Sequence, residues 1–116
     1  MSIKVKRVYA PAEEGDGYRI LVDRLWPRGI KKEDARVDLW LKALAPSTEL
    51  RKWFDHIPGR FPEFAERYEA EVRANADYAV LLDALKAHDI VTLLFGAKDE
   101  EHNNAVVLKK MTEEMG

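Results

Sequence analysis

A continuous run of six strand-forming residues, 90–95 (Ile-Val-Thr-Leu-Leu-Phe), constrains the fold more than any other feature of the chain. Its length and its β-branched content predict a strand that is covered on both faces, as in a parallel or mixed sheet flanked by helices. Gly96 interrupts the run, and residues 100–115 follow with helical spacing. A strand, a short polar loop and a helix start often form a ligand site, because free backbone N–H groups and the positive end of the helix dipole meet there. We therefore expect the functional site around this loop.

Three further segments, residues 3–9, 18–22 and 37–41, also have the pattern of strands. Helical spacing and capping residues predict a single turn at residues 31–35 and helices that begin near Ser47, Pro62, Asp77 and Glu100. In the last helix, the expected buried stripe consists of Ala105, Leu108, Met111 and Met115. The sequence thus predicts one α/β domain over residues 1–116, with a mixed or mostly parallel sheet of about four strands and helices packed on it.

The composition narrows the classes of protein and of site. The chain has no cysteine, which excludes disulfides, thiolate nucleophiles and cysteine-ligated zinc. Its formal net charge of −2 gives no overall attraction to nucleic acid, so an anion-binding surface has to be a local cluster. No apolar run approaches the ~20 residues of a membrane-spanning helix, and the N-terminus has no apolar signal core. We expect a cytoplasmic protein that is a monomer or a homodimer and has no membrane partner.

A short apolar strand is followed directly by two arginines that flank a tryptophan. The ends of central strands in open α/β sheets are where ligands bind. The guanidinium groups of Arg24 and Arg28 suit a phosphate or a carboxylate, and Trp26 offers a flat face for stacking. The alternative is structural: Trp26 and Leu25 then belong to the core, and Asp23 pairs with a neighbouring arginine to hold the loop.

The polar loop before the last helix contains Lys98, Asp99, His102, Asn103 and Asn104. If Asp99 caps that helix, His102 lies in its first turn, where the dipole favours a neutral imidazole that accepts a proton. The alternative is a surface histidine that is bonded to Asp99 as part of the cap. Asn103 and Asn104 are poor helix formers, and two in succession indicate side chains that bind something specific. Lys98 either completes an anion site or is solvated.

Several other chemistries lack their motifs in this sequence. The glycines form neither GxGxxG nor GxxxxGK[ST], and no GxSxG elbow is present. Ser47 follows a proline at a helix start, which favours a capping role. His56 lies at the end of that helix, where the dipole favours a histidine. His56, His102 and an aspartate could together bind a metal, but no closely spaced pair of histidines occurs, so we expect no metal. We also expect no cofactor.

Five motifs in order, DRLWPRG, LWLKALAPS, LRKWFDH, FAERYEAE and VTLLFGAKDEEHNNAVVL, closely resemble those of the YeaO-like family of small bacterial proteins, over nearly the whole chain. The family has no settled activity, so the resemblance implies positions rather than a reaction. These positions are Asp23, Arg24, Trp26, Pro27, Arg28, Gly29, Lys42, Pro46, Ser47, His56, Arg67, Tyr68, Asp99, His102 and Asn103. A wider group of relatives carries a Cys-His-Arg type segment in the loop after the last strand. Here that stretch has no cysteine, which argues against a borrowed thiol mechanism.

Three functional hypotheses follow. The first is a binder of an anionic small ligand, phosphate- or nucleotide-like, in which Arg24 and Arg28 clamp the anion and Trp26 walls the pocket. In this hypothesis His102, oriented by Asp99, serves as acid or base if the protein is an enzyme. The second is a non-enzymatic nucleic-acid-associated module that uses the same surface, although the chain lacks a basic stripe. The third is a protein-interaction module in which the three tryptophans are partly interfacial. The expected ligand-binding residues of the first hypothesis are Asp23, Arg24, Trp26, Arg28, Lys98 and Asn103.

Overall fold

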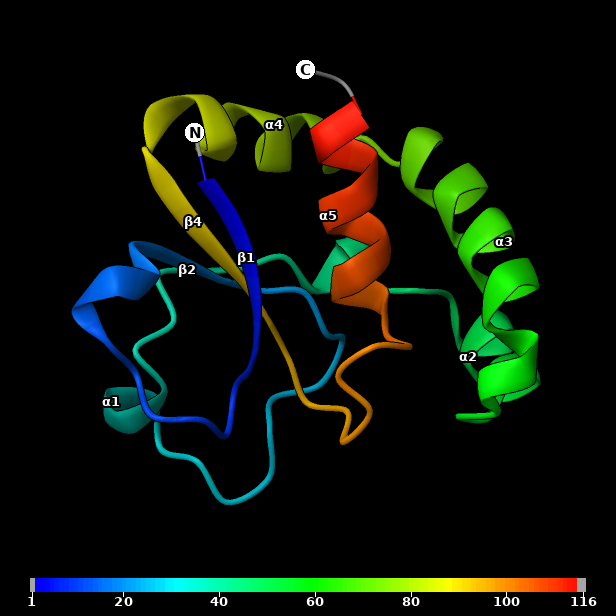
Figure 1. Cartoon of the computed structure of the whole chain (residues 1–116), viewed down its shortest axis with the longest axis horizontal. Helices are drawn as coiled ribbons and strands as arrows, with labels where there is room; N and C mark the ends of the chain where they lie inside the picture. The colour runs from blue at the N-terminus through cyan, green and yellow to red at the C-terminus, as the bar shows by residue number, and fades with distance from the viewer. Residues whose placement is uncertain (1, 115–116) are drawn as a thin grey trace.

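One sheet of four parallel strands, in the order β1-β4-β2-β3, organises the computed structural model, which describes residues 2–114 (Figure 1). The strands are β1 (Ser2–Arg7), β2 (Tyr18–Leu21), β3 (Leu39–Trp40) and β4 (Ile90–Phe95). The α-helices are α1 (Lys32–Ala35), α2 (Thr48–Phe54), α3 (Phe61–Arg73), α4 (Tyr78–Ala87) and α5 (Asn104–Glu114). Three short 3-10 helices, η1 (Glu14–Asp16), η2 (Lys42–Leu44) and η3 (Pro58–Arg60), complete the described elements.

β4 is the strand on which the sheet is built. It pairs with β1 on one side and with β2 on the other, and its residues 91–95 are all buried. The prediction of a central strand with both faces covered is therefore confirmed, and the sheet is parallel throughout. Side chains alternate between the two faces of a strand, so Val91, Leu93 and Phe95 face one layer while Thr92 and Leu94 face the other.

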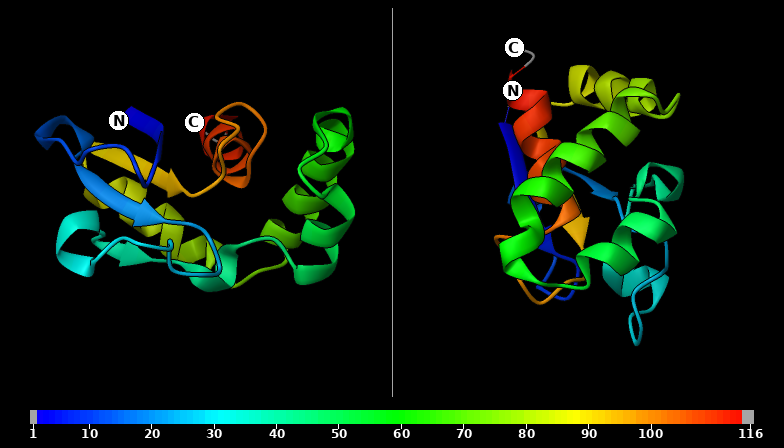
Figure 2. Two further views of the ribbon diagram at one scale, coloured as in Figure 1. Left: turned by 90° about the horizontal axis from the view of Figure 1, so that it is seen from below. Right: turned by 90° about the vertical axis from the view of Figure 1, so that its right-hand side faces the viewer.

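The helices cover one face of the sheet. α5 packs on β1 and β4, and α3 packs against the outer side of α5 (Figures 1 and 2). The core of this face joins strand residues such as Ile20 and Leu93 to Leu85 of α4, Leu108 of α5 and Tyr68 of α3. The Tyr68 hydroxyl donates a 2.6 Å hydrogen bond to the Leu44 carbonyl, which satisfies the one polar atom of that buried side chain.

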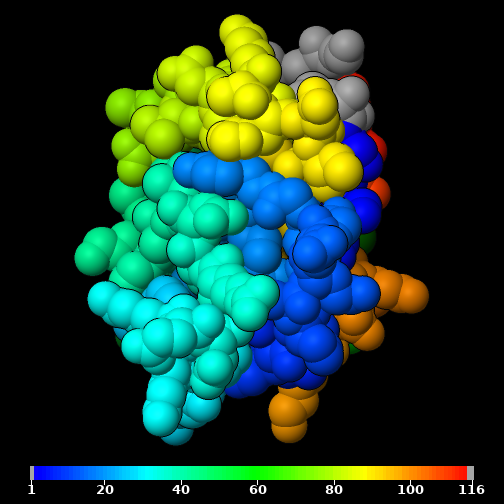
Figure 3. Space-filling model, turned by 90° about the vertical axis from the view of Figure 1, so that its left-hand side faces the viewer, coloured from blue at the N-terminus to red at the C-terminus, as the bar shows by residue number. Residues whose placement is uncertain are grey.

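Loops and the short α1 cover the other face. Val8, Leu21, Ala35 and Leu94 form a second, smaller buried cluster, with Trp26 and other partly buried side chains packed against it. Figure 3 shows that the blue N-terminal segment and the cyan segment after β2 lie side by side on this side of the molecule. The loop that carries the arginine–tryptophan motif is therefore also part of the structural cover of the sheet.

A buried ionic cluster fastens the β1–β2 connection to the same face. The Asp16 carboxylate accepts hydrogen bonds from Arg19 Nη1 at 2.5 Å and from Lys6 Nζ at 3.1 Å. Arg19 also donates to the carbonyls of Ala35 and Arg36, and the Thr92 hydroxyl donates to the Asp16 carbonyl at 2.7 Å. One buried cluster thus joins β1, η1, β2, β4 and the end of α1.

The element boundaries differ from the predictions mainly at three places. The strand predicted at 3–9 spans Ser2–Arg7, and the strand predicted at 37–41 has ladder pairing only at Leu39–Trp40. The last helix begins at Asn104 rather than at Glu100. Ser47 caps α2 as predicted, because its Oγ accepts the Leu50 N–H at 3.2 Å. Ala105, Leu108 and Met111 are buried as predicted, and Met115 lies outside the described residues. Within residues 2–114, every helix is too short or too polar to cross a membrane.

The ionic cluster predicts a pH-dependent contribution to stability. Burial raises the pKa of Asp16, but the Glu13 amide, Lys6 and Arg19 outweigh it and hold this pKa below its ordinary value. The ionised carboxylate therefore stabilises the fold at neutral pH, and this contribution is lost as the pH falls through the folded-state pKa. Asp16→Asn should lower the free energy of unfolding by about 3 kcal/mol at pH 7.

Urea denaturation at several pH values tests this prediction. The difference between the parent protein and Asp16→Asn should narrow in acid, and Asp83→Asn on the exposed side of α4 provides a matched control with little effect. Equal stability of the parent and Asp16→Asn at pH 7 would contradict the structural role of the cluster.

Candidate functional site

A cavity of about 690 Å³ lies at the carboxyl edge of the sheet. Three segments supply most of its lining: the loop after β2, the loop between β4 and α5, and the C-terminal half of α2 with the turn that follows. Pro46, before α2, and Phe64 of α3 also line it. Figure 1 shows the first two segments leaving the same lower edge of the sheet. The residues that line the cavity include Asp23, Arg24, Leu25, Trp26, Pro27, Arg28, Pro46, Arg51, Lys52, Phe54, Asp55, His56, Phe64, Gly96, His102, Asn103 and Asn104. The predicted meeting of the arginine segment with the loop before the last helix is present in the structure.

Asp23 holds the inner part of the cavity together. Its Oδ2 accepts the Gly96 N–H at 2.8 Å, and its Oδ1 accepts a hydrogen bond from Asn104 Nδ2 at 3.1 Å. A Cβ atom at position 96 would lie only 3.1 Å from Asp23 Oδ2, so this close approach favours glycine. Burial raises the pKa of Asp23, although Gly96, Asn104 and Arg51 oppose this shift. The structural alternative, in which Asp23 pairs with Arg24 or Arg28, is wrong, because Asp23 forms no salt bridge among residues 2–114.

The loop after β2 is closed by two tryptophans. Trp26 Nε1 donates to the Ile30 carbonyl at 2.8 Å, and Trp40 Nε1 donates to the Asp23 carbonyl at 2.8 Å. The two rings meet edge to face at 5.5 Å between centroids. Trp26 is therefore half-buried: one part of its side chain packs against the second core cluster, and the remaining part lines the cavity. Leu25 is 69% exposed, so its expected alternative place in the core is wrong.

Basic side chains surround the opening of the cavity. Arg24, Arg28, Arg51 and Lys52 are all exposed, and among residues 2–114 none of them forms a salt bridge. Arg24 makes one long hydrogen bond, 3.5 Å from its Nη2 to the Pro46 carbonyl. We use the name basic rim for these four residues. The rim is a local positive cluster in a chain whose formal net charge is −2.

The loop between β4 and α5 is built differently from the prediction. Asp99 does not cap α5; its Oδ1 accepts the N–H groups of Glu101 and His102 within the loop, at 2.9 and 3.0 Å. The side chain of Asn103 caps the helix instead, because its Oδ1 accepts the Val106 N–H at 3.0 Å. Asparagine and aspartate cap helices about equally well, so Asn103 can take the role that was predicted for Asp99. The helix therefore begins about one turn later than predicted. His102 consequently lies before α5 rather than in its first turn.

Asp99 and His102 form a hydrogen-bonded pair. Asp99 Oδ2 lies 2.9 Å from His102 Nδ1, and the His102 ring meets Phe61 edge to face at 5.2 Å. The Glu101 amide and the His102 ring lower the pKa of Asp99. With the proton on Nδ1, His102 presents a free Nε2, for which the described residues provide no hydrogen-bond partner. His102 lines the cavity, whereas Asp99 supports it from outside.

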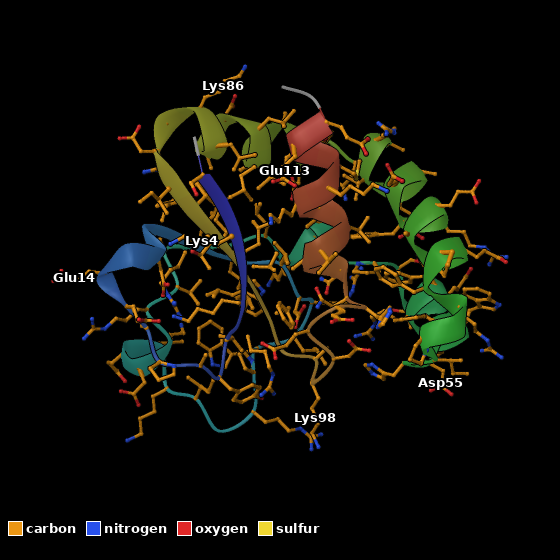
Figure 4. All side chains as sticks on the ribbon, viewed as in Figure 1. Lys4, Glu14, Asp55, Lys86, Lys98 and Glu113 are labelled. Atoms are coloured by element: carbon orange, nitrogen blue, oxygen red, sulfur yellow. The ribbon has the colours of Figure 1, made fainter. Side chains whose placement is uncertain are left out.

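Lys98 does not line the cavity. It is exposed, and Figure 4 shows its side chain at the tip of the loop, directed away from the body of the protein. The solvated alternative therefore describes Lys98 better than a place in the anion site.

The wall contributed by α2 was not predicted. Arg51 and Lys52 are separated in sequence from the motif at Arg24 and Arg28, and their spacing is that of an ordinary solvated helix face. Beyond the helix, Asp55 and His56 both have positive φ angles, 47° and 53°. Two consecutive non-glycine residues in this region are uncommon, and they turn the chain at the edge of the cavity. The motif LRKWFDH was the signal that could have directed attention to this wall.

Residues that could hold a metal ion are not clustered. Among residues 2–114, no group of three or more histidine, aspartate or glutamate side chains is arranged to ligate a metal ion.

The fold and the cavity define a class: a small parallel α/β protein with a basic-rimmed cavity at the carboxyl edge of its sheet. The chain belongs to the family described as the inactive DUF488-N3 subclade (DUF488-N3i), whose model matches residues 2–115. It is 49% identical over 108 residues to the uncharacterised protein YeaO of Escherichia coli (strain K12), covering 93% of this chain and 94% of YeaO. It is 43% identical over 109 residues to the uncharacterised protein Rv3073c of Mycobacterium tuberculosis (strain ATCC 25618 / H37Rv), covering 94% and 92% of the two chains. The resemblance to the YeaO-like family is thereby confirmed. No solved structure matches the chain.

Removal of the Asp23 carboxylate should loosen the cavity. Asp23→Ala leaves the Gly96 N–H and Asn104 Nδ2 without this acceptor, and the free energy of unfolding should fall by about 2 kcal/mol at pH 7. Because the folded-state pKa of Asp23 is raised, its protonated form is favoured by folding. The parent should therefore gain further stability over Asp23→Ala as the pH falls through that pKa, the opposite of the trend for Asp16→Asn.

Denaturant titrations across the acid range measure both effects. Asp34→Ala, an exposed acidic position in α1, provides the matched control. A stability difference that narrowed in acid would contradict the assigned environment of Asp23.

Proposed function

We propose that this protein binds an anionic small ligand, phosphate- or nucleotide-like, in the cavity at the carboxyl edge of its sheet. The single observation that carries the proposal is the basic rim: four exposed cationic side chains without salt bridges among the described residues, around one cavity of about 690 Å³. Cavities of about 300–1,000 Å³ are typical of small-molecule sites. Arginine offers the planar fork that suits phosphate and carboxylate, and Trp26 offers a wall.

The family description favours binding over turnover. The subclade is described as inactive, and this chain has no cysteine that could act as a thiolate nucleophile. Asp23 lies at the inner end of the cavity, where Gly96 and Asn104 fix its carboxylate with one hydrogen bond to each oxygen. The proposal therefore assigns Asn103 to shaping the site, and Arg24 and Arg28 to contact with the anionic group of the ligand.

The nucleic-acid and protein-interaction alternatives have less support. The basic rim surrounds a cavity instead of forming a stripe along one face, which suits a small ligand better than a polynucleotide. Each tryptophan ring already has partners within the chain; Trp53, for example, lies beside the guanidinium groups of Arg60 and Arg67 at 5.5 and 4.5 Å. The proposal is consequently restricted to a small anion.

Thermal shift with a panel of anions tests the proposal. Phosphate, pyrophosphate, glucose 6-phosphate and nucleoside monophosphates should raise the melting temperature of the parent protein, because a ligand that binds only the folded state stabilises it. Arg28→Ala should weaken binding about tenfold or more, since hydrogen bonds to charged groups contribute about 1.5–3 kcal/mol.

Arg73→Ala removes the same charge from an exposed site on α3, outside the cavity, and should leave the shift intact. Equal responses of Arg28→Ala and the parent, or no response of the parent to any anion, would contradict the proposal. Salt-steep binding to oligonucleotides without any response to small anions would favour the nucleic-acid alternative.

The His102–Asp99 pair favours acid–base catalysis as a second candidate function. A histidine held through Nδ1 by a carboxylate, with Nε2 free at a cavity, has the arrangement of a general acid or base. Phosphorus-31 NMR of the parent incubated with the anion panel should then show a new species. The species should be lost in His102→Asn and retained in His88→Asn, whose histidine stacks on Tyr18 outside the cavity. An unchanged panel with the parent would exclude catalysis on these compounds and leave the binding function standing.

A further inference from the structure

The cavity changes in chemical character from its inner end to its opening. Asp23 and Asn104, at the inner end, are half-buried and present oxygen acceptors, whereas the four side chains of the basic rim are exposed and present only donors. The exposed part of the lining also includes one carboxylate, Asp55, so its four cationic side chains leave it with an excess of positive charge. Such a gradient cannot be matched by a simple inorganic anion, because an anion would be attracted to the rim and repelled by a carboxylate. A ligand that fills the whole cavity has to differ between its two ends.

The orientation of the Asn104 carboxamide is fixed by its neighbours. Its Nδ2 lies 2.9 Å from the Val22 carbonyl oxygen and 3.1 Å from Asp23 Oδ1. Both neighbours are acceptors, so the NH₂ group has to face them and the carbonyl Oδ1 has to face away. Among residues 2–114, Oδ1 has no hydrogen-bond partner, and no buried side-chain nitrogen or oxygen lacks one. Asn104 Oδ1 is therefore accessible, in a side chain that lines the cavity.

The Asp23 carboxylate has spare accepting capacity beside it. Oδ2 receives the Gly96 N–H and Oδ1 receives the Asn104 NH₂, one hydrogen bond each. A carboxylate oxygen accepts two, so each still has a free lone pair. Together with Asn104 Oδ1, the inner end offers adjacent acceptors and no free side-chain donor from these two residues. It is suited to N–H groups of a ligand.

The walls between the two ends are apolar and partly flat. Trp26, Pro27, Phe54 and Phe64 come from three different segments and line the cavity together. Aromatic and proline surfaces favour a planar ring, which packs on them with little loss of conformational freedom.

We propose that the ligand is a planar heterocycle with an exocyclic amino group at one end and a phosphate at the other, as in a nucleoside 5′-monophosphate. The amino group donates to Asn104 Oδ1 and Asp23, and the phosphate binds the basic rim. This inference rests on the anion-binding function proposed above and adds the class of the ligand and its direction in the cavity.

Matched pairs of nucleotides test the inference on the parent protein by isothermal titration calorimetry. Adenosine 5′-monophosphate is compared with purine riboside 5′-monophosphate, and cytidine 5′-monophosphate with pyrimidin-2-one riboside 5′-monophosphate; each pair differs in the amino group. Adenosine and inorganic phosphate are the controls for the two ends. At least one amino-bearing nucleotide should bind about tenfold more tightly than its partner, as expected for one hydrogen bond in a partly buried site.

Two variants assign the two ends of the ligand. Asn104→Ala should abolish the discrimination within a pair while retaining the advantage of the nucleotide over the nucleoside. Arg28→Ala should abolish the advantage of the nucleotide over the nucleoside while retaining the discrimination within a pair. Because Asn104→Ala also loses the hydrogen bond to Val22, its folding is checked by circular dichroism, and the pair comparison on the parent needs no variant.

The outcomes separate this inference from the proposed function. Equal affinities within both pairs, with phosphate still required, would overturn the inference and leave anion binding intact. Binding of inorganic phosphate but of no nucleotide would also overturn the inference and leave anion binding intact. Nucleosides that bind as tightly as nucleotides, or no binding of any compound, would overturn both.

Discussion

The hydrogen bonds of a single carboxylate, that of Asp23, determine how the carboxyl edge of this protein is assembled. Asp23 lies two residues after the end of β2, and it holds the backbone after β4 at Gly96 and the first residue of α5 at Asn104. Its own carbonyl receives the indole N–H of Trp40. The Asp23 side chain thus joins the loop after β2 to the two ends of the loop between β4 and α5, which lie far from it in the sequence. Burial raises the pKa of Asp23, so the protein maintains this junction at an electrostatic cost.

The asymmetry of the sheet explains why the loop after β2 has two roles. Helices cover one face, whereas loops and α1 cover the other, and Trp26 lies at the border between the second core cluster and the cavity. The indole is held by the Ile30 carbonyl and by contact with Trp40. A wall that is also part of the core is rigid, and for the proposed ligand a rigid wall would lower the entropic cost of binding. The adjacent arginines, Arg24 and Arg28, are exposed, as contact with the proposed anion requires.

The sequence allowed most of the fold to be predicted, because the strand at 90–95 and the amphipathic helices follow local periodicity. The position of the arginine motif at a cavity with His102 was also predicted, since carboxyl ends of parallel strands share an edge. The start of α5 was not, because Asp99 and Asn103 are both good caps and only the tertiary contacts of the loop decide between them. Arg51 and Lys52 were missed because nothing local to α2 indicates which long-range neighbour its polar face meets. Roles for the ligand-binding residues remain predictions until a ligand is bound.

The brevity of β3 has a consequence for how copies of the chain meet. β3 forms one margin of the sheet, and it contributes only Leu39–Trp40 to the ladder. A margin this short offers few unpaired N–H and C=O groups as a template for a foreign strand. Its neighbour β2 is long enough to be such a template, but it is enclosed between β3 and β4. Cross-β stacking through this side of the sheet is therefore discouraged by geometry, without any charged gatekeeper residue being required.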